Sequence, residues 1–285
     1  MLFEIPDLKL RNPYLSIALD EALSLYFSKQ ESFRGGIRFW ANHYTTVLGR
    51  TCKPKDNLNE EFLKKFHVSH RKSEWLQNPA LCRRASGGGT VLHGPGSINF
   101  SFFFPLKKFP ELFPVKKSYE ILLSMIIDAL KLMDVEATFS GQSDIAVNDS
   151  LNSARKISGN AQFRKHGILV HHGTLITHKE LIPQIGRFLN HPPKEPDYRK
   201  KRNHADFLGS LPETFDIAAF YHALKNIAGR QFKGNEWQKL AYFDRKIIFR
   251  VARKMVREIY GDESWILEGK LNTPWKMDVP EREYS

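Results

Sequence analysis

A glycine-rich stretch between residues 82 and 104 most constrains what this chain can fold into. It reads Cys-Arg-Arg-Ala-Ser-Gly-Gly-Gly-Thr-Val-Leu-His-Gly-Pro-Gly-Ser-Ile-Asn-Phe-Ser-Phe-Phe-Phe. Three consecutive glycines cost backbone entropy, so they indicate a place where a Cβ would collide or where φ must be positive. Bare N–H groups beside two guanidinium groups form a concave site for a phosphate or carboxylate. The stretch predicts a nucleotide- or acid-binding loop, with a glycine-rich hairpin turn as the alternative.

Hydrophobic periodicity predicts strands that pair through short turns, with helices between the groups of strands. The predicted strands span residues 37–41 and 45–49 (as a hairpin), 97–104, 144–148, 156–163 and its antiparallel partner 167–177. The predicted helices span residues 16–28, 118–133, 178–189, 214–226 and 243–260, with a helix-like stretch at 58–68 and a loop at 69–80. This order favours an α+β fold over a doubly wound parallel sheet.

The 285 residues contain no internal repeat and no clean linker, so we expect one domain over residues 1–285 with a frayed tail at 272–285. A net charge of +12 and a pI near 9.6 favour anionic partners. The densest basic run, Lys194 to Arg202, is expected to be a solvated loop. Basic residues interleaved with aromatics on one face are not visible, so a nucleic-acid-binding module is only a distant alternative.

The composition also sets expectations about the compartment. Apolar runs stay short of a membrane span, and the N-terminus lacks the pattern of a signal peptide. Cys52 and Cys82 cannot form a disulfide framework or a four-cysteine zinc site. We therefore expect a cytoplasmic protein without a membrane partner.

The glycines follow neither the P-loop pattern nor G-x-G-x-x-G, which argues against a P-loop ATPase or a Rossmann reductase. A second group of polar residues comprises Ser143-Asp144 and the segment Lys156-Ile-Ser-Gly-Asn-Ala-Gln. A strand lysine followed by Ser-Gly-Asn places a fixed positive charge where the backbone comes close. A solvent-facing lysine is the alternative.

A third group is His171-His172-Gly-Thr-Leu. Adjacent residues on a strand point to opposite faces, so these two histidines cannot easily bind one metal ion. Because a completing set of cysteines or carboxylates is missing from the pattern, metal ligation by them is not expected.

Together these motifs resemble lipoate–protein ligases of the biotin/lipoate ligase superfamily: Arg-Arg-x-Ser-Gly-Gly-Gly-x-Val-x-His, then Asp-Ile, Lys-Ile-Ser-Gly-Asn-Ala-Gln and His-His-Gly-Thr-Leu. The resemblance is strong over residues 12–212 and weak over 213–265. It implies mixed, mainly antiparallel β-sheets packed with helices. It also implies an enzyme that forms lipoyl-AMP from lipoate and ATP and then acylates a lysine on a lipoyl domain.

Residue by residue, the resemblance makes Lys156 the essential lysine that touches both the activated carboxylate and the α-phosphate. The residues that match the family's contacts to ATP and acyl-adenylate are Arg84, Gly88, Gly89, Thr90, Val91, Leu92, Asp144 and Gly159. The residues expected to line the lipoyl pocket are Arg84, His93, Lys156 and His172. A structural role stays open for the two histidines and for the Thr90 side chain. Mg²⁺ is expected near Asp144, whereas the residues of the acyl tunnel are not readable.

Two departures from the family pattern keep alternatives open. Gly94 follows His93 where the family often has Asp, and His-Gly-Pro-Gly resembles the related octanoyltransferases, which need no ATP. Those transferases use a cysteine near the position of Ser143, and neither cysteine of this chain lies there. Arg83 could lower the pKa of Cys82, although a buried structural cysteine is the simpler interpretation.

The second departure concerns length, because ligases of this type often carry a C-terminal accessory domain that is not expected here. A separate chain could supply it. The implied acceptors are apo lipoyl domains of 2-oxoacid dehydrogenases or the glycine cleavage H protein. The choice between lipoate and octanoate stays open.

Overall fold

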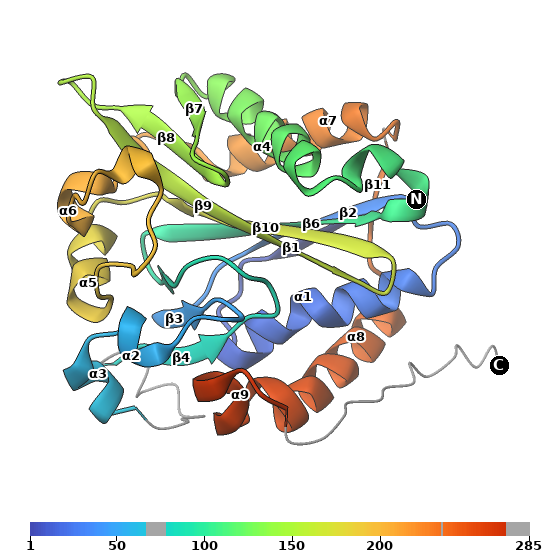
Figure 1. The fold of residues 1–285 in the computed structure, drawn as a ribbon. Helices are drawn as coiled ribbons and strands as arrows, with labels where there is room; N and C mark the ends of the chain where they lie inside the picture. The colour runs from blue at the N-terminus through green and yellow to red at the C-terminus, as the bar shows by residue number, and fades with distance from the viewer. Residues whose placement is uncertain (67–77, 235, 272–285) are drawn as a thin grey trace.

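The computed structural model describes residues 1–66, 78–234 and 236–271, and its centre is an eight-stranded sheet (Figure 1). The strands run in the order β11-β1-β2-β6-β10-β9-β8-β7. Only the β11–β1 and β1–β2 pairs are parallel. The eight strands are β1 (Leu2–Asp7), β2 (Gly35–Trp40), β6 (Ser97–Pro105), β7 (Ala137–Ser140), β8 (Asp144–Asn148), β9 (Ala154–Lys165), β10 (Ile168–Ile176) and β11 (Trp237–Lys239). The predicted α+β class with mainly antiparallel pairing is confirmed.

Helices cover both faces of this sheet (Figure 1). One face packs against α4 and α7, and the other packs against α1 and α8. The α-helices are α1 (Pro13–Ser28), α2 (Pro54–Asn57), α3 (Glu60–Lys64), α4 (Val115–Lys131), α5 (Leu181–Phe188), α6 (His204–Phe207), α7 (Ile217–Gln231), α8 (Tyr242–Met255) and α9 (Glu263–Glu268). Short 3₁₀ turns lie at 106–108, 110–112 and 197–199, and α8 continues as a π-helical turn over Val256–Tyr260.

The long helix α1 starts three residues earlier than the sequence pattern predicts. The side chain of Asn12 accepts a hydrogen bond from the amide of Leu15, and Pro13 occupies the first turn. Asn is a favoured N-cap and Pro is favoured at the first helical position, where its missing N–H is not needed. The Asn-Pro-Tyr segment therefore begins the helix instead of forming a separate turn.

The predicted hairpin over residues 37–49 is wrong. Strand β2 lies between β1 and β6, so both of its edges are occupied by other strands. Strand β3 (Thr45–Leu48) belongs to a second, three-stranded sheet, where it pairs with β4 (Ala80–Arg83) and β5 (Val91–His93). The partners of both strands come from segments more than thirty residues away, so local turn signals could not identify them.

The predicted pair 156–163 and 167–177 is confirmed as the antiparallel hairpin β9–β10, and the predicted helices correspond to α1, α4, α5, α7 and α8. The helix-like stretch at 58–68 contains α3, and its last residues lie outside the described ranges. The same is true of most of the predicted loop 69–80 and of the tail 272–285.

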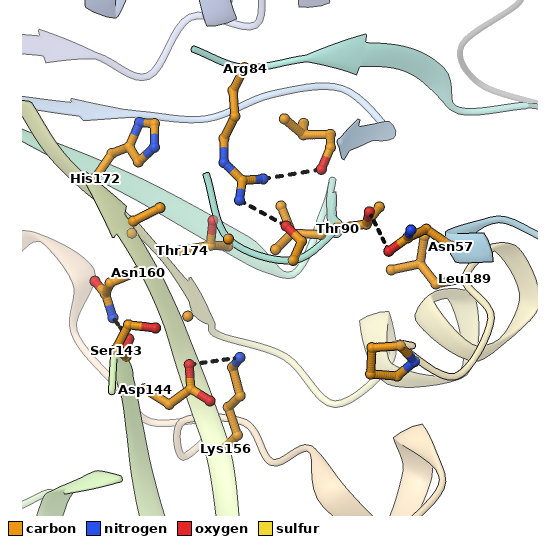
Figure 2. Close-up of a pocket in the computed structure, with 18 of the residues that line it drawn as sticks. Asn57, Arg84, Thr90, Ser143, Asp144, Lys156, Asn160, His172, Thr174 and Leu189 are labelled. Carbon is orange, nitrogen blue, oxygen red and sulfur yellow. Dashed lines mark hydrogen bonds and ion pairs between the residues drawn. The ribbon is translucent and has the colours of Figure 1, made fainter. Parts of the chain in front are cut away.

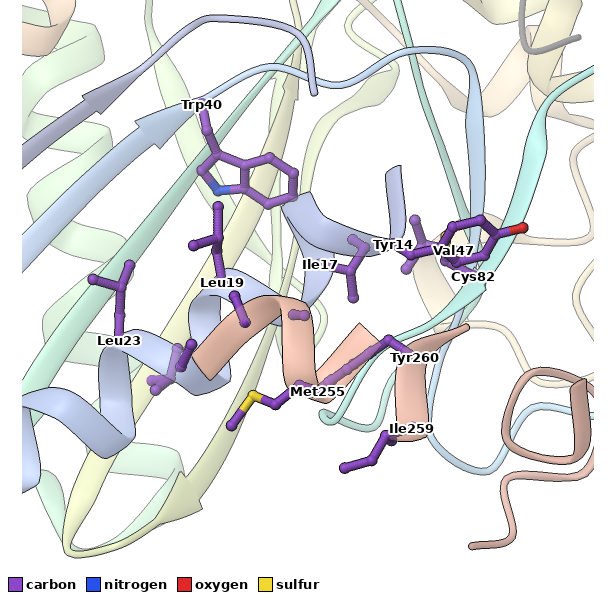
Figure 3. Close-up of a cluster of buried hydrophobic side chains, with 14 of the residues drawn as sticks. Tyr14, Ile17, Leu19, Leu23, Trp40, Val47, Cys82, Met255, Ile259 and Tyr260 are labelled. Atoms are coloured by element: carbon purple, nitrogen blue, oxygen red, sulfur yellow. The ribbon is translucent and has the colours of Figure 1, made fainter. Parts of the chain in front are cut away.

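Buried apolar side chains form two clusters, one on each side of the large sheet. The cluster below the sheet in Figure 1 joins α1, the small sheet and α8, and Figure 3 shows part of it. Ile17 from α1, Val47 from β3 and Tyr260 from the π-helical turn meet there. Within the described residues, every helix is too short or too polar to cross a membrane.

Candidate active site

A cavity of about 850 Å³ opens where the large sheet, the small sheet and residues 189–199 meet. Its wall includes Arg84, the glycine loop from Gly88 to Val91, Asp144 and Lys156 (Figure 2). The predicted residues Gly159, His93 and His172 line it as well. Segments more than a hundred residues apart in the sequence therefore converge on one cavity.

Lys156 and Asp144 form an ion pair at one end of this cavity. Lys156 Nζ lies 2.8 Å from Asp144 Oδ1, and the hydroxyl of Tyr198 donates a hydrogen bond of 2.9 Å to Asp144 Oδ2. Burial and the neighbouring Asp144 raise the pKa of Tyr198, so its hydroxyl stays protonated as a donor. A Cβ on Gly159 would lie 3.0 Å from the ammonium, which explains the glycine beside the lysine. The side chain of Lys156 is 24% exposed, so its charge can face a ligand.

A β-bulge aims Lys156 into the cavity. Ala146 pairs with Lys156, but its neighbour Ile145 pairs with Ser158, so β9 has one extra residue at this point. Such an insertion shifts the alternation of side chains by one. Ile157 therefore packs in the apolar cluster on the opposite face, while Lys156 lies on the cavity face with Gly159. Strict alternation from the sequence would place Lys156 on the opposite face from Gly159.

Arg84 holds the glycine loop together. Its Nη1 donates to the carbonyl of Val47 at 3.2 Å, and its Nη2 donates to the carbonyls of Gly87 and Gly89 at 2.6 and 2.8 Å. Its Nε donates to Ser86 Oγ at 2.9 Å. Burial lowers the pKa of Arg84 to about 10, which still leaves the guanidinium charged at neutral pH. The charge thus sits under the loop and makes its exposed side attractive to an anion.

Two further residues shape the same loop. Gly88 adopts a φ of +84°, a left-handed conformation that a residue with a Cβ rarely takes. The hydroxyl of Thr90 donates to Asn57 Oδ1 at 3.1 Å (Figure 2), which ties the loop to α2. The Thr90 side chain therefore has the structural contact that the sequence left open.

Leu92 is the one predicted site residue that does not line the cavity, because its side chain is buried in the core beneath the small sheet. The expectation of a solvated loop from Lys194 to Arg202 holds only in part. Lys194, Lys200 and Lys201 are exposed, but residues 194–199 also line the cavity. Arg199, for example, is only 4% exposed and stacks over the ring of Phe207.

The other end of the cavity is apolar, and the sequence did not reveal it. Its apolar lining comes from α1, both sheets and the π-helical turn, and comprises Ile17, Trp40, Val47, Val91, Phe163 and Tyr260. Tyr260 donates a hydrogen bond of 2.7 Å to the buried Glu21, so its hydroxyl is satisfied. Glu21 and Asp20 line the cavity as well, and both are hydrogen-bonded within the protein. A ligand with one anionic end and one hydrocarbon end fits this division.

The histidines occupy three different environments. His171 and His172 point to opposite faces of β10, as predicted, and His171 is fully buried away from the cavity. His93 Nε2 lies 3.1 Å from Thr174 Oγ1, and burial lowers the pKa of His93 to about 3, so the ring is neutral.

Within residues 1–66, 78–234 and 236–271, no three His, Cys, Asp or Glu side chains gather as metal ligands.

Neither cysteine is placed for catalysis. Cys82 is 1% exposed in β4, and burial raises its pKa, so the lowered pKa considered from the neighbouring arginine is wrong. Cys52 donates to the carbonyl of Gly88 on the outer side of the loop. Both lie outside the cavity lining, and Ser143 occupies the wall ahead of the lysine motif.

Comparison with known proteins points to one family. The Lipoyl protein ligase A/B catalytic domain matches residues 12–229. Lipoate-protein ligase LplJ of Bacillus subtilis is 29% identical over 184 residues, which cover 62% of this chain and 46% of that protein. The probable lipoate-protein ligase A of Mycoplasma genitalium is 31% identical over 179 residues, or 63% and 47% of the two proteins. The chain spans about half the length of these curated relatives.

Solved structures share the fold. The bi-partite lipoate protein ligase of Thermoplasma acidophilum, described with its E2 lipoyl domain, superposes with a TM-score of 0.72 at 18% identity over 96% of this chain and 99% of that one. A lipoate-protein ligase A bound with ATP gives a TM-score of 0.67 at 19% identity over 93% and 98%. At these identities the likeness extends to the fold alone.

Proposed function

Because this chain belongs to the family of the Lipoyl protein ligase A/B catalytic domain, we propose that it activates lipoate or octanoate with ATP and transfers the acyl group to a lysine of a lipoyl domain. The observation that carries this proposal is the division of the cavity. A fixed ammonium and a glycine loop form one end, and apolar side chains form the other. An acyl-adenylate has the matching parts, namely a phosphate, a mixed anhydride and a hydrocarbon tail.

Lys156 acts on the reacting atoms. Its ammonium lies on the cavity wall, where it orients the attacking carboxylate and stabilises the negative charge that develops at the α-phosphate as pyrophosphate leaves. Asp144 keeps the lysine in place through the 2.8 Å ion pair. In the second step the same charge stabilises the anhydride carbonyl while the acceptor amine attacks and AMP leaves.

Arg84 and the loop bind the nucleotide part. The N–H groups of Gly88, Gly89, Thr90 and Val91 belong to a loop whose shape Arg84 maintains from below. The acyl tail occupies the apolar end, where burial of each CH₂ contributes about 0.8 kcal/mol. His93 and His172 contribute polar side chains to the wall of the same cavity.

The site also fits a magnesium ion that comes with ATP. Mg²⁺ is usually held by one or two carboxylates together with substrate phosphates and water. Asp144 supplies one carboxylate on the cavity wall, although both its oxygens have protein partners. Asp144 would therefore contribute a single ligand, and the bound ion would neutralise phosphate charge.

The ATP-independent transferase is less well supported. A thioester intermediate needs a cysteine at the acyl site, and neither Cys52 nor Cys82 lines the cavity. Acceptors of the proposed ligase are apo lipoyl domains of 2-oxoacid dehydrogenases or the glycine cleavage H protein. By analogy with the bi-partite ligase of Thermoplasma acidophilum, we include a separate accessory chain in the proposal.

The decisive experiment mixes the protein with lipoate, Mg-ATP and an apo lipoyl domain. We expect pyrophosphate release and a lipoyl-sized increase in the mass of the domain, with both signals absent when ATP is left out. An octanoyl-carrier protein without ATP is the matched comparison. Modification from that donor alone would overturn the ligase assignment in favour of a transferase.

A further inference from the structure

Four side chains beneath the glycine loop form a continuous hydrogen-bonded chain. Asp20 Oδ2 lies 3.1 Å from His172 Nδ1, and His172 Nε2 lies 2.6 Å from Ser86 Oγ. Ser86 Oγ accepts the 2.9 Å hydrogen bond from Arg84 Nε. The chain connects α1, β10 and the loop after β4, and we call these four residues the relay.

The direction of each hydrogen bond in the relay follows from its two ends. Arg84 has only donors, so Ser86 must accept from it. Asp20 is the other end, with Oδ1 accepting from Arg38 at 2.8 Å and Oδ2 accepting from Ser101 at 2.8 Å. Burial opposes its charge, but hydrogen bonds to His172 and Arg38 outweigh burial and lower the pKa of Asp20. As an ionised carboxylate, Asp20 accepts hydrogen bonds only.

These ends fix the proton on the histidine between them. Because Asp20 accepts, His172 carries a proton on Nδ1. The Ser86 hydroxyl has two acceptors in reach, His172 Nε2 at 2.6 Å and the carbonyl of Gly87 at 3.5 Å. The shorter contact assigns the hydroxyl proton to a bare Nε2. The Ser86 oxygen then keeps a lone pair for Arg84. The other two nitrogens of Arg84 hold the carbonyls of Gly87 and Gly89, so the relay ends at the backbone of the loop.

We propose that Asp20 is a positioning residue that sets the tautomer of His172, and through Ser86 and Arg84 holds the glycine loop in its binding shape. The consequence for catalysis rests on the proposed function, because the loop is assigned there to the acyl-adenylate. The tautomer itself does not depend on that function. Asp20 also lines the cavity, but the role proposed for it acts through His172 and needs no contact with the reacting atoms.

An acid, a histidine and a serine in this order also resemble the triad of serine hydrolases. Ser86, however, is 1% exposed and does not line the cavity. Its oxygen already accepts from Arg84, which reduces its nucleophilicity. The arrangement therefore positions a cation instead of attacking an acyl group.

The first test reads the tautomer directly in the full chain labelled with ¹⁵N-histidine, by long-range ¹H–¹⁵N correlation. We expect a proton on Nδ1 of His172 and none on Nε2, with the signal identified by its loss in His172→Gln. His171 is the internal comparison, because its Nδ1 accepts from Gln162 and its proton must lie on Nε2. A proton on Nε2 of His172, or on both nitrogens, would overturn the proposal without any activity assay.

Asp20→Asn extends the test. Arg38 only donates hydrogen bonds, so the new asparagine must keep its amide oxygen toward Arg38. Its amide nitrogen then faces His172 and donates to the ring. We expect the histidine proton to move to Nε2 in this variant and to stay on Nδ1 in Asp20→Glu. A His172 spectrum that is the same in Asp20→Asn as in the wild type would contradict the relay.

The second test asks whether Asp20 and Ser86 act as a unit in acyl-adenylate formation. They are linked through His172, so Asp20→Asn and Ser86→Ala should each lower kcat/KM about 10- to 100-fold by misplacing the loop. The double variant should lose no more than the worse single variant. Independent, multiplying losses would overturn the positioning role, as would an acyl adduct on Ser86 in intact-protein mass spectra. A wild type that forms no adenylate defeats the proposed function and leaves the tautomer result standing.

Discussion

His171 and His172 are neighbours on β10, yet they belong to opposite faces of the large sheet with opposite properties. His171 is fully buried among aromatic rings, close to Phe100, Phe102 and Tyr119. His172 lines the cavity and is hydrogen-bonded at both ring nitrogens. The same residue type thus packs in the core on one face and lines the cavity on the other.

The two faces bury their residues in different ways. On the face that α4 and α7 cover (Figure 1), the buried side chains form an apolar cluster. On the cavity face a row of polar side chains crosses the strands, with Thr174 bonded to Asn99 and Ser101 bonded to both Asp20 and Trp40. Polar groups are costly to bury unless they are paired, so such a row indicates a selected function more than stability. Variants on each face should therefore fail in different ways.

The largest effect should come from Lys156→Ala on the cavity face. Removing one fixed charge from a transition state costs about 10²–10³-fold in rate, and Asp144 keeps Tyr198 as a partner in the variant. Pyrophosphate release should fall by that factor while the melting temperature stays close to the wild-type value. The control is Lys131→Ala on α4, at the opposite face of the sheet, which should retain full activity. Normal turnover by Lys156→Ala would remove the role assigned to this residue.

Adjacent residues of β5 offer a second contrast. Leu92 is buried in the core, so Leu92→Ala should lower the free energy of unfolding by about 2–4 kcal/mol, as measured by urea denaturation. Val91 lines the cavity, so Val91→Ala should mainly raise the KM for lipoate. An unchanged stability in the first variant, or an unchanged KM in the second, would contradict the division between core and cavity at this strand.

Strand pairing was predictable from the sequence only where the two strands are close neighbours in the chain. The hairpin β9–β10 was predictable because two alternating segments flank one short turn. The separation of β2 from β3 was not, because strand partners near Phe100 and Ala80 decide it. Side-chain alternation correctly separated His171 from His172, but the bulge that turns Lys156 toward the cavity leaves no local signal.

The site residues, too, were predictable only where they belong to one continuous segment. Motifs located the glycine loop and the lysine because each is a continuous segment with unusual residues. The apolar end comes from single residues such as Ile17, Phe163 and Tyr260, each on a different element, so only the fold brings them together. The link from Asp20 to Arg84 needs three elements and could not be read from any one of them.

The buried ring of His171 should make the free energy of unfolding depend on pH. Burial lowers the pKa of His171 from its ordinary 6.5 to about 3, so the folded protein keeps this ring neutral while the unfolded chain binds a proton. Its contribution to stability is therefore complete above pH 6.5 and declines as the pH falls toward 3, by about 1.4 kcal/mol per pH unit. His171→Phe should show a shallower loss of unfolding free energy between pH 6.5 and 4.5. Equal slopes for both proteins would contradict the neutral buried ring.

The smallest effect should come from the net charge of the protein, which acts outside the two faces of the large sheet. A net charge of +12 should speed the encounter with an acidic lipoyl domain, and salt should screen that attraction. Raising the ionic strength should roughly halve kcat/KM for the acceptor domain, while kcat at saturating acceptor stays constant because Lys156 and Arg84 lie within the cavity. A domain with its acidic residues neutralised is the control and should not respond to salt. If kcat falls along with kcat/KM, salt acts on the cavity face itself; if neither changes, the surface charge does not steer the acceptor.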